Sequence, residues 1–163
     1  MSLWKWWIAI AGTALIAGGV AWMLKLWVIV ATDGRVVATG AAATFLELGL
    51  GLLLVGSTGV GLRLAINQEP SMRVVLALAS PLVFMPAFLM FSVLGYALVA
   101  IGRVIAGDAV PDYLLEEGGI FVSAVVGLVV GIWLVVDVVV GGVSDSTDGA
   151  SGSRQVESQP RVR

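Results

Sequence analysis

The chain consists of long apolar runs separated by short polar segments. Four runs reach the length of about 20 residues that a helix needs to cross roughly 30 Å of hydrocarbon. They cover residues 4–30, 37–62, 74–101 and 120–140. The runs are apolar on all sides and lack the alternation of apolar and polar positions that membrane-spanning strands show. The pattern therefore predicts an all-α fold, an integral membrane bundle of four transmembrane helices.

Polar segments set the expected boundaries of these helices. Thr32 to Arg35 form the first turn, and a segment ending at Pro70 forms the second. The third separator, residues 103–119, is expected to be a solvated acidic loop that could include a short interfacial helix from Pro111 or, less readily, a cation site. Its acidic residues are Asp108, Asp112, Glu116 and Glu117.

The C-terminal end of the chain has a different composition from the rest. From Ser144 onward it is rich in Ser, Asp, Thr and Gly and almost free of large apolar residues. Such a segment buries too little apolar surface to offset the entropy lost on ordering, so we expect disorder. The chain then divides into a transmembrane domain, residues 1–143, and a polar cytoplasmic tail, residues 144–163.

Composition supports a membrane protein and narrows its chemistry. Hydrophobic residues make up 59% of the chain and charged residues 12%, about half the charged share of a soluble domain. The sequence has no Cys and no His, which excludes thiolate chemistry, zinc sites of the Cys/His type and a Ser-His-Asp triad. We therefore expect no cofactor, no metal and no enzymatic activity. A net charge of −2 offers no basic surface for nucleic acid.

Basic residues and tryptophans predict how the bundle sits in the cell membrane. Lys and Arg are more frequent at the N-terminus, in the second separator and in the tail than on the opposite side, so both termini are expected to be cytoplasmic. In the first span, Trp4, Trp6 and Trp7 are expected at one membrane interface. Trp22 and Trp27 are expected near the other, because indole rings favour headgroup depth.

Small residues at four-residue spacing predict where helices pack, since they let backbones approach closely. One ridge lies in the first span and another in the fourth. Whether these ridges pack within one chain or between chains stays open at this stage. Their members are Ala9, Thr13, Ala17 and Ala21 in the first span, and Ser123, Gly127 and Gly131 in the fourth.

Apart from Lys5 at the start of the first span, three charged residues fall inside the predicted spans, where a charge costs about 2.5–3.5 kcal/mol at the centre of the helix. Glu47 follows the start of its span by about 15 Å of helix, and Lys25 lies at a similar depth in the preceding span. The two could form an ion pair, or Glu47 could serve as a proton or cation site. Asp137 lies near the cytoplasmic end of the fourth span, where Arg63 or Arg73 could pair with it.

The overall residue usage resembles that of proteins from halophilic archaea. The chain has two Lys against seven Arg and much Val, Ala and Gly, and its tail carries the acidic run Ser144–Gly149. It is similar in this respect to uncharacterised multi-pass membrane proteins of such organisms. The resemblance is one of composition rather than of a motif, and it implies no activity.

Two functional hypotheses follow from these features. The first is a non-enzymatic accessory subunit or self-associating bundle, whose partners are the lipid bilayer and other membrane subunits or further copies of the chain. The alternative is a small oligomeric transporter, coupled to protons or cations, that uses Glu47. The abundance of packing surface and the lack of a catalytic constellation favour the first.

Overall fold

The computed structural model describes residues 3–35, 40–106 and 111–152, and it describes the side chains within these ranges except those of Glu116 and residues 141–152. Within these ranges the chain forms four helices and no strands. They are α1 (Leu3–Ala31), α2 (Gly40–Leu64), α3 (Pro70–Ala106) and α4 (Tyr113–Gly152). All four are long and apolar enough to cross a membrane. The prediction of an all-α, four-helix membrane protein is confirmed.

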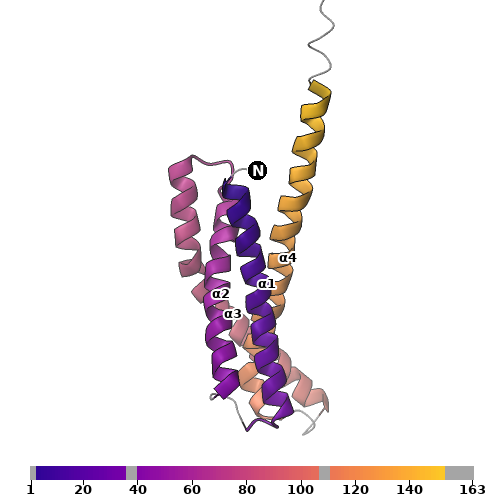
Figure 1. Ribbon diagram of the computed structural model, residues 1–163. Helices are drawn as coiled ribbons and strands as arrows, with labels where there is room; N and C mark the ends of the chain where they lie inside the picture. Colours follow the sequence, from indigo (N-terminus) through magenta and orange to yellow (C-terminus); the bar gives the residue numbers. More distant parts are fainter. Residues whose placement is uncertain (1–2, 36–39, 107–110, 153–163) are drawn as a thin grey trace, which may run out of the picture.

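The helices are arranged in chain order around the bundle. α1 packs against α2 and α4, α3 also packs against α2 and α4, and contact between α2 and α4 is slight. The start of α1 and the end of α4 lie at the same end of the bundle, and the end of α1, the start of α2, the end of α3 and the start of α4 lie at the other (Figure 1). This is the alternating direction that four successive crossings require. Which end faces the cytoplasm stays a prediction.

The turn after α1 forms where the sequence predicts it. Asp33 and Gly34 have φ angles of 52° and 72°, and the N–H of Gly34 donates to the carbonyl of Ile29 at 2.9 Å. A left-handed pair of this kind closes the last turn of a helix and suits glycine. A side chain at position 34 would also collide with the ring of Tyr113, so the turn is fixed against the start of α4.

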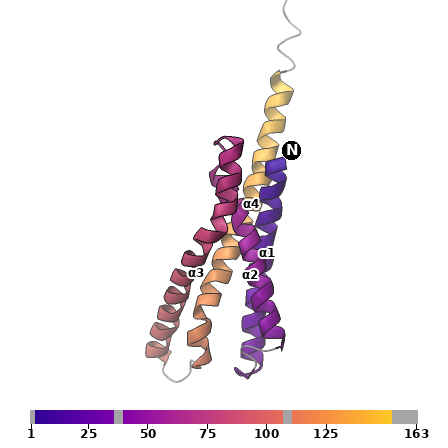
Figure 2. The same ribbon diagram turned by 90° about the vertical axis from the view of Figure 1, so that its left-hand side faces the viewer.

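Two prolines bend α3 without ending it. Pro81 and Pro86 lie inside the helix, and Figure 2 shows α3 changing direction in its middle, as proline in a helix interior causes. Pro81 has no N–H to donate to the carbonyl of Ala77, but the Ser80 hydroxyl donates to that oxygen at 2.8 Å. The bend turns most of α3 outward, and only 6% of its most apolar window is buried.

α4 differs from its predicted bounds at both ends. It begins at Tyr113, seven residues before the predicted start at Ile120, because the N–H groups of Leu114 and Leu115 already bond to Pro111 and Asp112. The helix continues to Gly152, eight residues past Ser144, where the predicted tail starts. Extending a formed helix costs far less than starting one. Asp108 and tail residues 153–163 lie outside the described residues.

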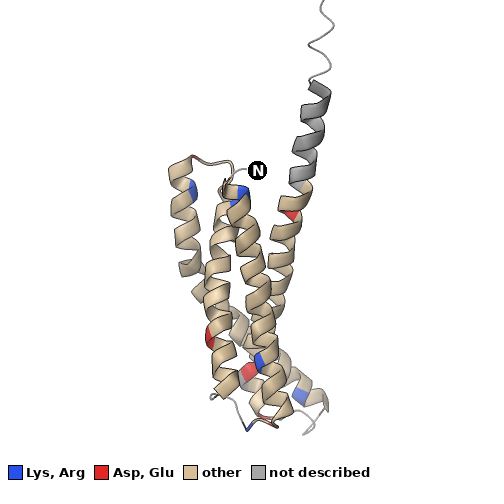
Figure 3. Cartoon of the chain, viewed as in Figure 1, with Lys and Arg blue, Asp and Glu red and all other residues tan. Residues whose placement is uncertain are grey.

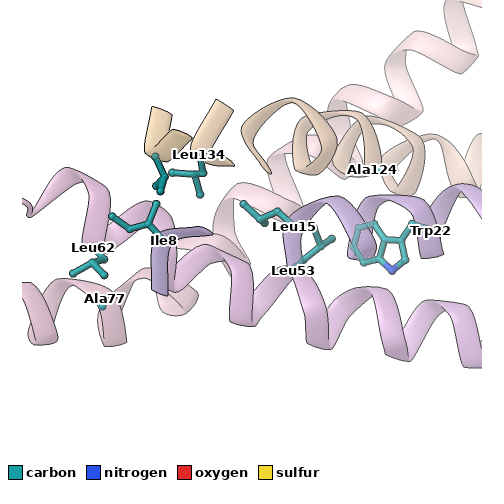
Figure 4. Close-up of a cluster of buried hydrophobic side chains, with 9 residues drawn as sticks. Ile8, Leu15, Trp22, Leu53, Leu62, Ala77, Ala124 and Leu134 are labelled. Atoms are coloured by element: carbon teal, nitrogen blue, oxygen red, sulfur yellow. The ribbon is translucent and has the colours of Figure 1, made fainter. Parts of the chain in front are cut away.

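The core lies along the α1 face that meets α2 and α4, with Ala77 from α3 beside Leu62 (Figure 4). Trp22 is its largest fully buried side chain, and its indole N–H donates to the carbonyl of Leu46 at 3.0 Å. The interfacial position predicted for Trp22 is wrong. Gly49 of α2 explains this, since a side chain there would overlap the indole ring. The small residue makes room for tryptophan inside the bundle.

Candidate functional site

A buried ion pair joins α1 to α4. The Lys25 ammonium donates to both carboxylate oxygens of Glu117, at 2.7 and 2.6 Å. The two side chains are only 4% and 6% exposed. Lys25 precedes the end of α1 by about 9 Å of helix, and Glu117 follows the start of α4 by about 6 Å. Both charges therefore lie at one depth and neutralise each other inside the protein.

This pair corrects two predictions. The partner of Lys25 is not Glu47, because Lys25 points into the bundle whereas Glu47 is exposed on the outer side of α2. Counting residues gives depth along a helix but does not give the direction around its axis. Glu117 is not part of a solvated loop either, because α4 begins early enough to include it and the residue is 5% exposed.

Glu47 lies on the surface that α2 presents to the surroundings of the bundle. It follows Gly40 by seven residues, about 10 Å of helix, which places it inside the hydrocarbon zone. Among the residues that the structure describes, none forms a hydrogen bond or ion pair with its carboxyl group. Leu48 and Val55, on the same exposed stripe, are 51% and 45% exposed. A carboxyl group at this depth thus faces outward with apolar neighbours.

A second ion pair, between α2 and α4, matches the prediction for Asp137. Arg63 donates from Nε and from one terminal nitrogen to the two carboxylate oxygens of Asp137, at 2.7 and 2.9 Å. The two side chains are 31% and 32% exposed, as expected near a membrane boundary. The guanidinium also lies 5.9 Å from the centre of the Trp133 ring, within cation–π range. Figure 3 shows how few charges lie between the two ends of the bundle.

The two predicted small-residue ridges have different surroundings. In α4, Ser123, Gly127 and Gly131 are all buried, and a Cβ at Gly131 would lie 2.7 Å from the carbonyl oxygen of Gly12 in α1. This ridge therefore packs within the chain.

The small-residue ridge predicted for α1 is not the surface that packs against α4. Ala21 is buried and Ala9 half-buried, but Thr13 and Ala17 are exposed, and the Thr13 hydroxyl donates to the carbonyl of its own helix at Ala9. The close contacts are made instead by three glycines of α1, namely Gly12, Gly18 and Gly19. A role for the exposed residues between chains stays a prediction.

No cluster of three or more acidic, Cys or His side chains that could hold a metal ion occurs within residues 3–35, 40–106 and 111–152. In the acidic segment before α4, Asp112 is exposed and pairs with Arg103, while Glu117 is held by Lys25. The acidic residues described there are thus engaged separately.

A cavity of about 340 Å³ lies between α2, α3 and α4, with Leu15 of α1 also in its lining. Its wall is almost entirely apolar and includes three serines, Ser57, Ser80 and Ser123, one from each of the three main helices. Sequence reasoning did not find this cavity. The two prolines of α3 were its available signal, since the lining of α3 runs from Leu76 to Phe91 across the bend.

Comparison of the chain with protein-family models, with curated proteins and with solved structures finds no match. Clues to function therefore come from the geometry of the chain itself. Of the acidic side chains described within the four spans, two are neutralised by a basic partner and Glu47 is not. The Glu47 carboxyl group therefore lacks a partner among the described residues.

Proposed function

We propose that this protein is a non-enzymatic subunit that binds another transmembrane helix through the outer face of α2. The observation that carries the proposal is Glu47, an exposed carboxyl group at membrane depth without a partner among the described residues. A charged group facing lipid is costly, up to about 2.5–3.5 kcal/mol at the bilayer centre on insertion scales. Contact with a helix that supplies a hydrogen-bond donor removes most of that cost.

The surroundings of Glu47 suit a helix as the occupant of this face. Thr44, Leu48, Gly51 and Val55 form an exposed stripe along α2, the α2 stripe. A Cβ placed on Gly51 would meet no atom within 4 Å, so the glycine is not needed for packing inside the chain. A small residue beside a polar one is the composition that favours close helix association in lipid.

Charge complementarity favours a different subunit over a second copy. In a symmetric pair formed through the α2 stripe, the two Glu47 carboxyl groups would approach each other, and like charges disfavour that contact. Lys25 and Arg63 are already engaged by Glu117 and Asp137, so neither is free to neutralise Glu47 of a second copy. A partner helix that carries a Lys, Arg, Ser or Thr opposite Glu47 meets the requirement directly.

Site-specific photo-crosslinking tests the proposal in the native membrane. A photoreactive residue at Leu48 should capture one defined protein, whereas the same residue at Leu78 of α3, which is 70% exposed, should capture mainly lipid. Replacing Glu47 with Leu should reduce the protein crosslink at Leu48 at least severalfold, since the shared hydrogen bond is lost. Capture of lipid alone at both positions would contradict the proposal.

The position of Glu47 also favours a second candidate, a small oligomeric transporter coupled to protons or cations. Because Lys25 is engaged by Glu117, it does not neutralise Glu47, which is therefore left available to bind a proton or a cation. Reconstituted in liposomes, a transporter of this kind would lose proton or cation flux on Glu47→Gln while keeping its helical content. Equal flux in the two proteins, or none in either, would eliminate this candidate.

A further inference from the structure

The cavity between α2, α3 and α4 has the size of a site for a small lipophilic molecule. Its volume of about 340 Å³ falls within the range of about 300–1,000 Å³ that ligand pockets occupy. A cavity of about 150 Å³ holds one benzene ring, so this one fits roughly two fused rings. The lining is almost entirely apolar, which excludes a charged or strongly hydrated guest.

The origin of the cavity is the bend of α3. Leu76, Ser80, Phe84 and Ala87 line it from α3, on the two sides of Pro81 and close to Pro86. The Ser80 hydroxyl donates to the Ala77 carbonyl in place of the N–H that Pro81 lacks. The bend at Pro81 therefore does not leave that carbonyl without a donor.

One hydroxyl group in the lining has no hydrogen-bond partner among the described residues. It belongs to Ser123 of α4, which is 3% exposed. The other two lining hydroxyls donate to their own helices, Ser57 to Leu54 at 2.7 Å and Ser80 to Ala77 at 2.8 Å. A buried hydroxyl without a partner is uncommon, and rotation about χ1 can redirect it without moving the backbone.

From these observations we infer that the cavity binds a membrane-dissolved ring compound that carries a carbonyl group, a quinone or a molecule of similar chemistry. The ring body fills the apolar volume next to Phe84 and Phe91, and the carbonyl oxygen accepts a hydrogen bond from the Ser123 hydroxyl. A plain acyl chain fills the same volume but leaves that hydroxyl unpaired. Ser123 follows Tyr113 by ten residues, about 15 Å of helix, a depth that membrane-dissolved molecules reach. This inference does not depend on the role of Glu47.

Two probes of nearly equal shape test it, methylnaphthoquinone and methylnaphthalene, which differ in the carbonyl groups. Apparent affinities are taken from the ligand-induced rise in the thermal unfolding midpoint of the purified protein at fixed detergent concentration. We expect the quinone to bind roughly tenfold more tightly than the hydrocarbon, because the buried hydroxyl gains its partner. Each affinity is expressed against the concentration of probe dissolved in the micelles, because the hydrocarbon enters detergent more readily than the quinone.

Three variants locate the effect. Ser123→Ala should reduce the preference for the quinone to about onefold and leave hydrocarbon binding unchanged. Ala87→Leu should weaken both probes at least tenfold, because the added side chain fills the cavity. Ser92→Ala removes an α3 hydroxyl that donates to Phe88 and lies outside the cavity lining, so it should change neither affinity.

Three outcomes overturn the inference. Equal affinity of the wild-type protein for the two probes would identify a site for plain hydrocarbon chains. A quinone preference that persists in Ser123→Ala would show that this hydroxyl makes no contact with the ligand. Absence of saturable stabilisation by either probe would show that the cavity binds neither. Far-UV circular dichroism confirms that each variant is folded, and the wild-type comparison stands even if a variant is not.

Discussion

The ion pair between Lys25 and Glu117 allows a quantitative test of the fold. Both side chains are almost fully buried, at 4% and 6% exposure, so neither charge can turn to water when the other is removed. Breaking such a pair by replacing one partner costs about 3–5 kcal/mol, whereas replacing both by apolar residues of similar size is often neutral. We expect Lys25→Met to cost about 3 kcal/mol, because it leaves the Glu117 carboxylate buried without its partner.

The assay is a double-mutant cycle measured by unfolding in mixed micelles of sodium dodecyl sulfate, with helical content as the signal. Glu117→Leu alone should cost about as much as Lys25→Met, and the double variant should lie within about 1 kcal/mol of the wild-type protein. Because the two single costs of about 3 kcal/mol each would nearly vanish in the double variant, the coupling energy should be about 5 kcal/mol. Single variants that each cost less than about 1 kcal/mol, with additive effects, would refute the reasoning.

An exposed pair provides the control. Arg103 and Asp112 form an ion pair in which the side chains are 37% and 81% exposed. Pairs of this kind contribute about 0–1 kcal/mol. Arg103→Gln should therefore change the free energy of unfolding by about 0.5 kcal/mol or less in the same assay.

Two further predictions concern the packing between helices. Gly131→Val should destabilise the bundle by about 1–3 kcal/mol, since its Cβ would lie 2.7 Å from the Gly12 carbonyl oxygen. As the control, Gly102→Ala places a Cβ with no atom within 4 Å and should be neutral or stabilise by up to about 1 kcal/mol. An equal loss of stability in both variants would contradict the contact. Trp22→Phe should cost about 2 kcal/mol, because the bond to Leu46 is lost and a void is left in the core; a change below about 0.5 kcal/mol in the unfolding assay would place Trp22 outside the core.

The number of helices and their approximate bounds could be predicted because the signal is strong and local. Apolar runs of this length have few alternatives to a membrane helix. The turn at Gly34 and the bend of α3 are likewise local effects of residue type. The pair between Arg63 and Asp137 was predictable for a related reason, since both lie near one end of the bundle and few other charges are available there.

Features that depend on rotation about a helix axis could not be predicted in the same way. α1 is apolar on every side, so the sequence does not distinguish its buried face, with Gly12 and Gly19, from its exposed face, with Thr13 and Ala17. The same ambiguity led to Glu47, rather than Glu117, as the partner of Lys25. The burial of Trp22 depends on Gly49 in another helix, which is information that no single span contains.

The cavity is a product of three helices and was beyond sequence reasoning for that reason. Ser57, Ser80 and Ser123 are distant in the chain, and each reads as an ordinary packing residue of its own span. The prolines of α3 indicate a distortion of the helix, but they do not indicate the space that the distortion opens. That the Ser123 hydroxyl has no hydrogen-bond partner can be recognised only when its surroundings are known.

The most direct test of the central claim is native mass spectrometry of the tagged protein, released mildly from its own membrane, beside its Glu47→Leu variant. The account predicts a stoichiometric complex of the wild-type chain with a different membrane protein, and predominantly free monomer for the variant, with unchanged helical content. A wild-type protein that is found only as monomers, or a complex that forms equally well with Leu at position 47, would contradict it.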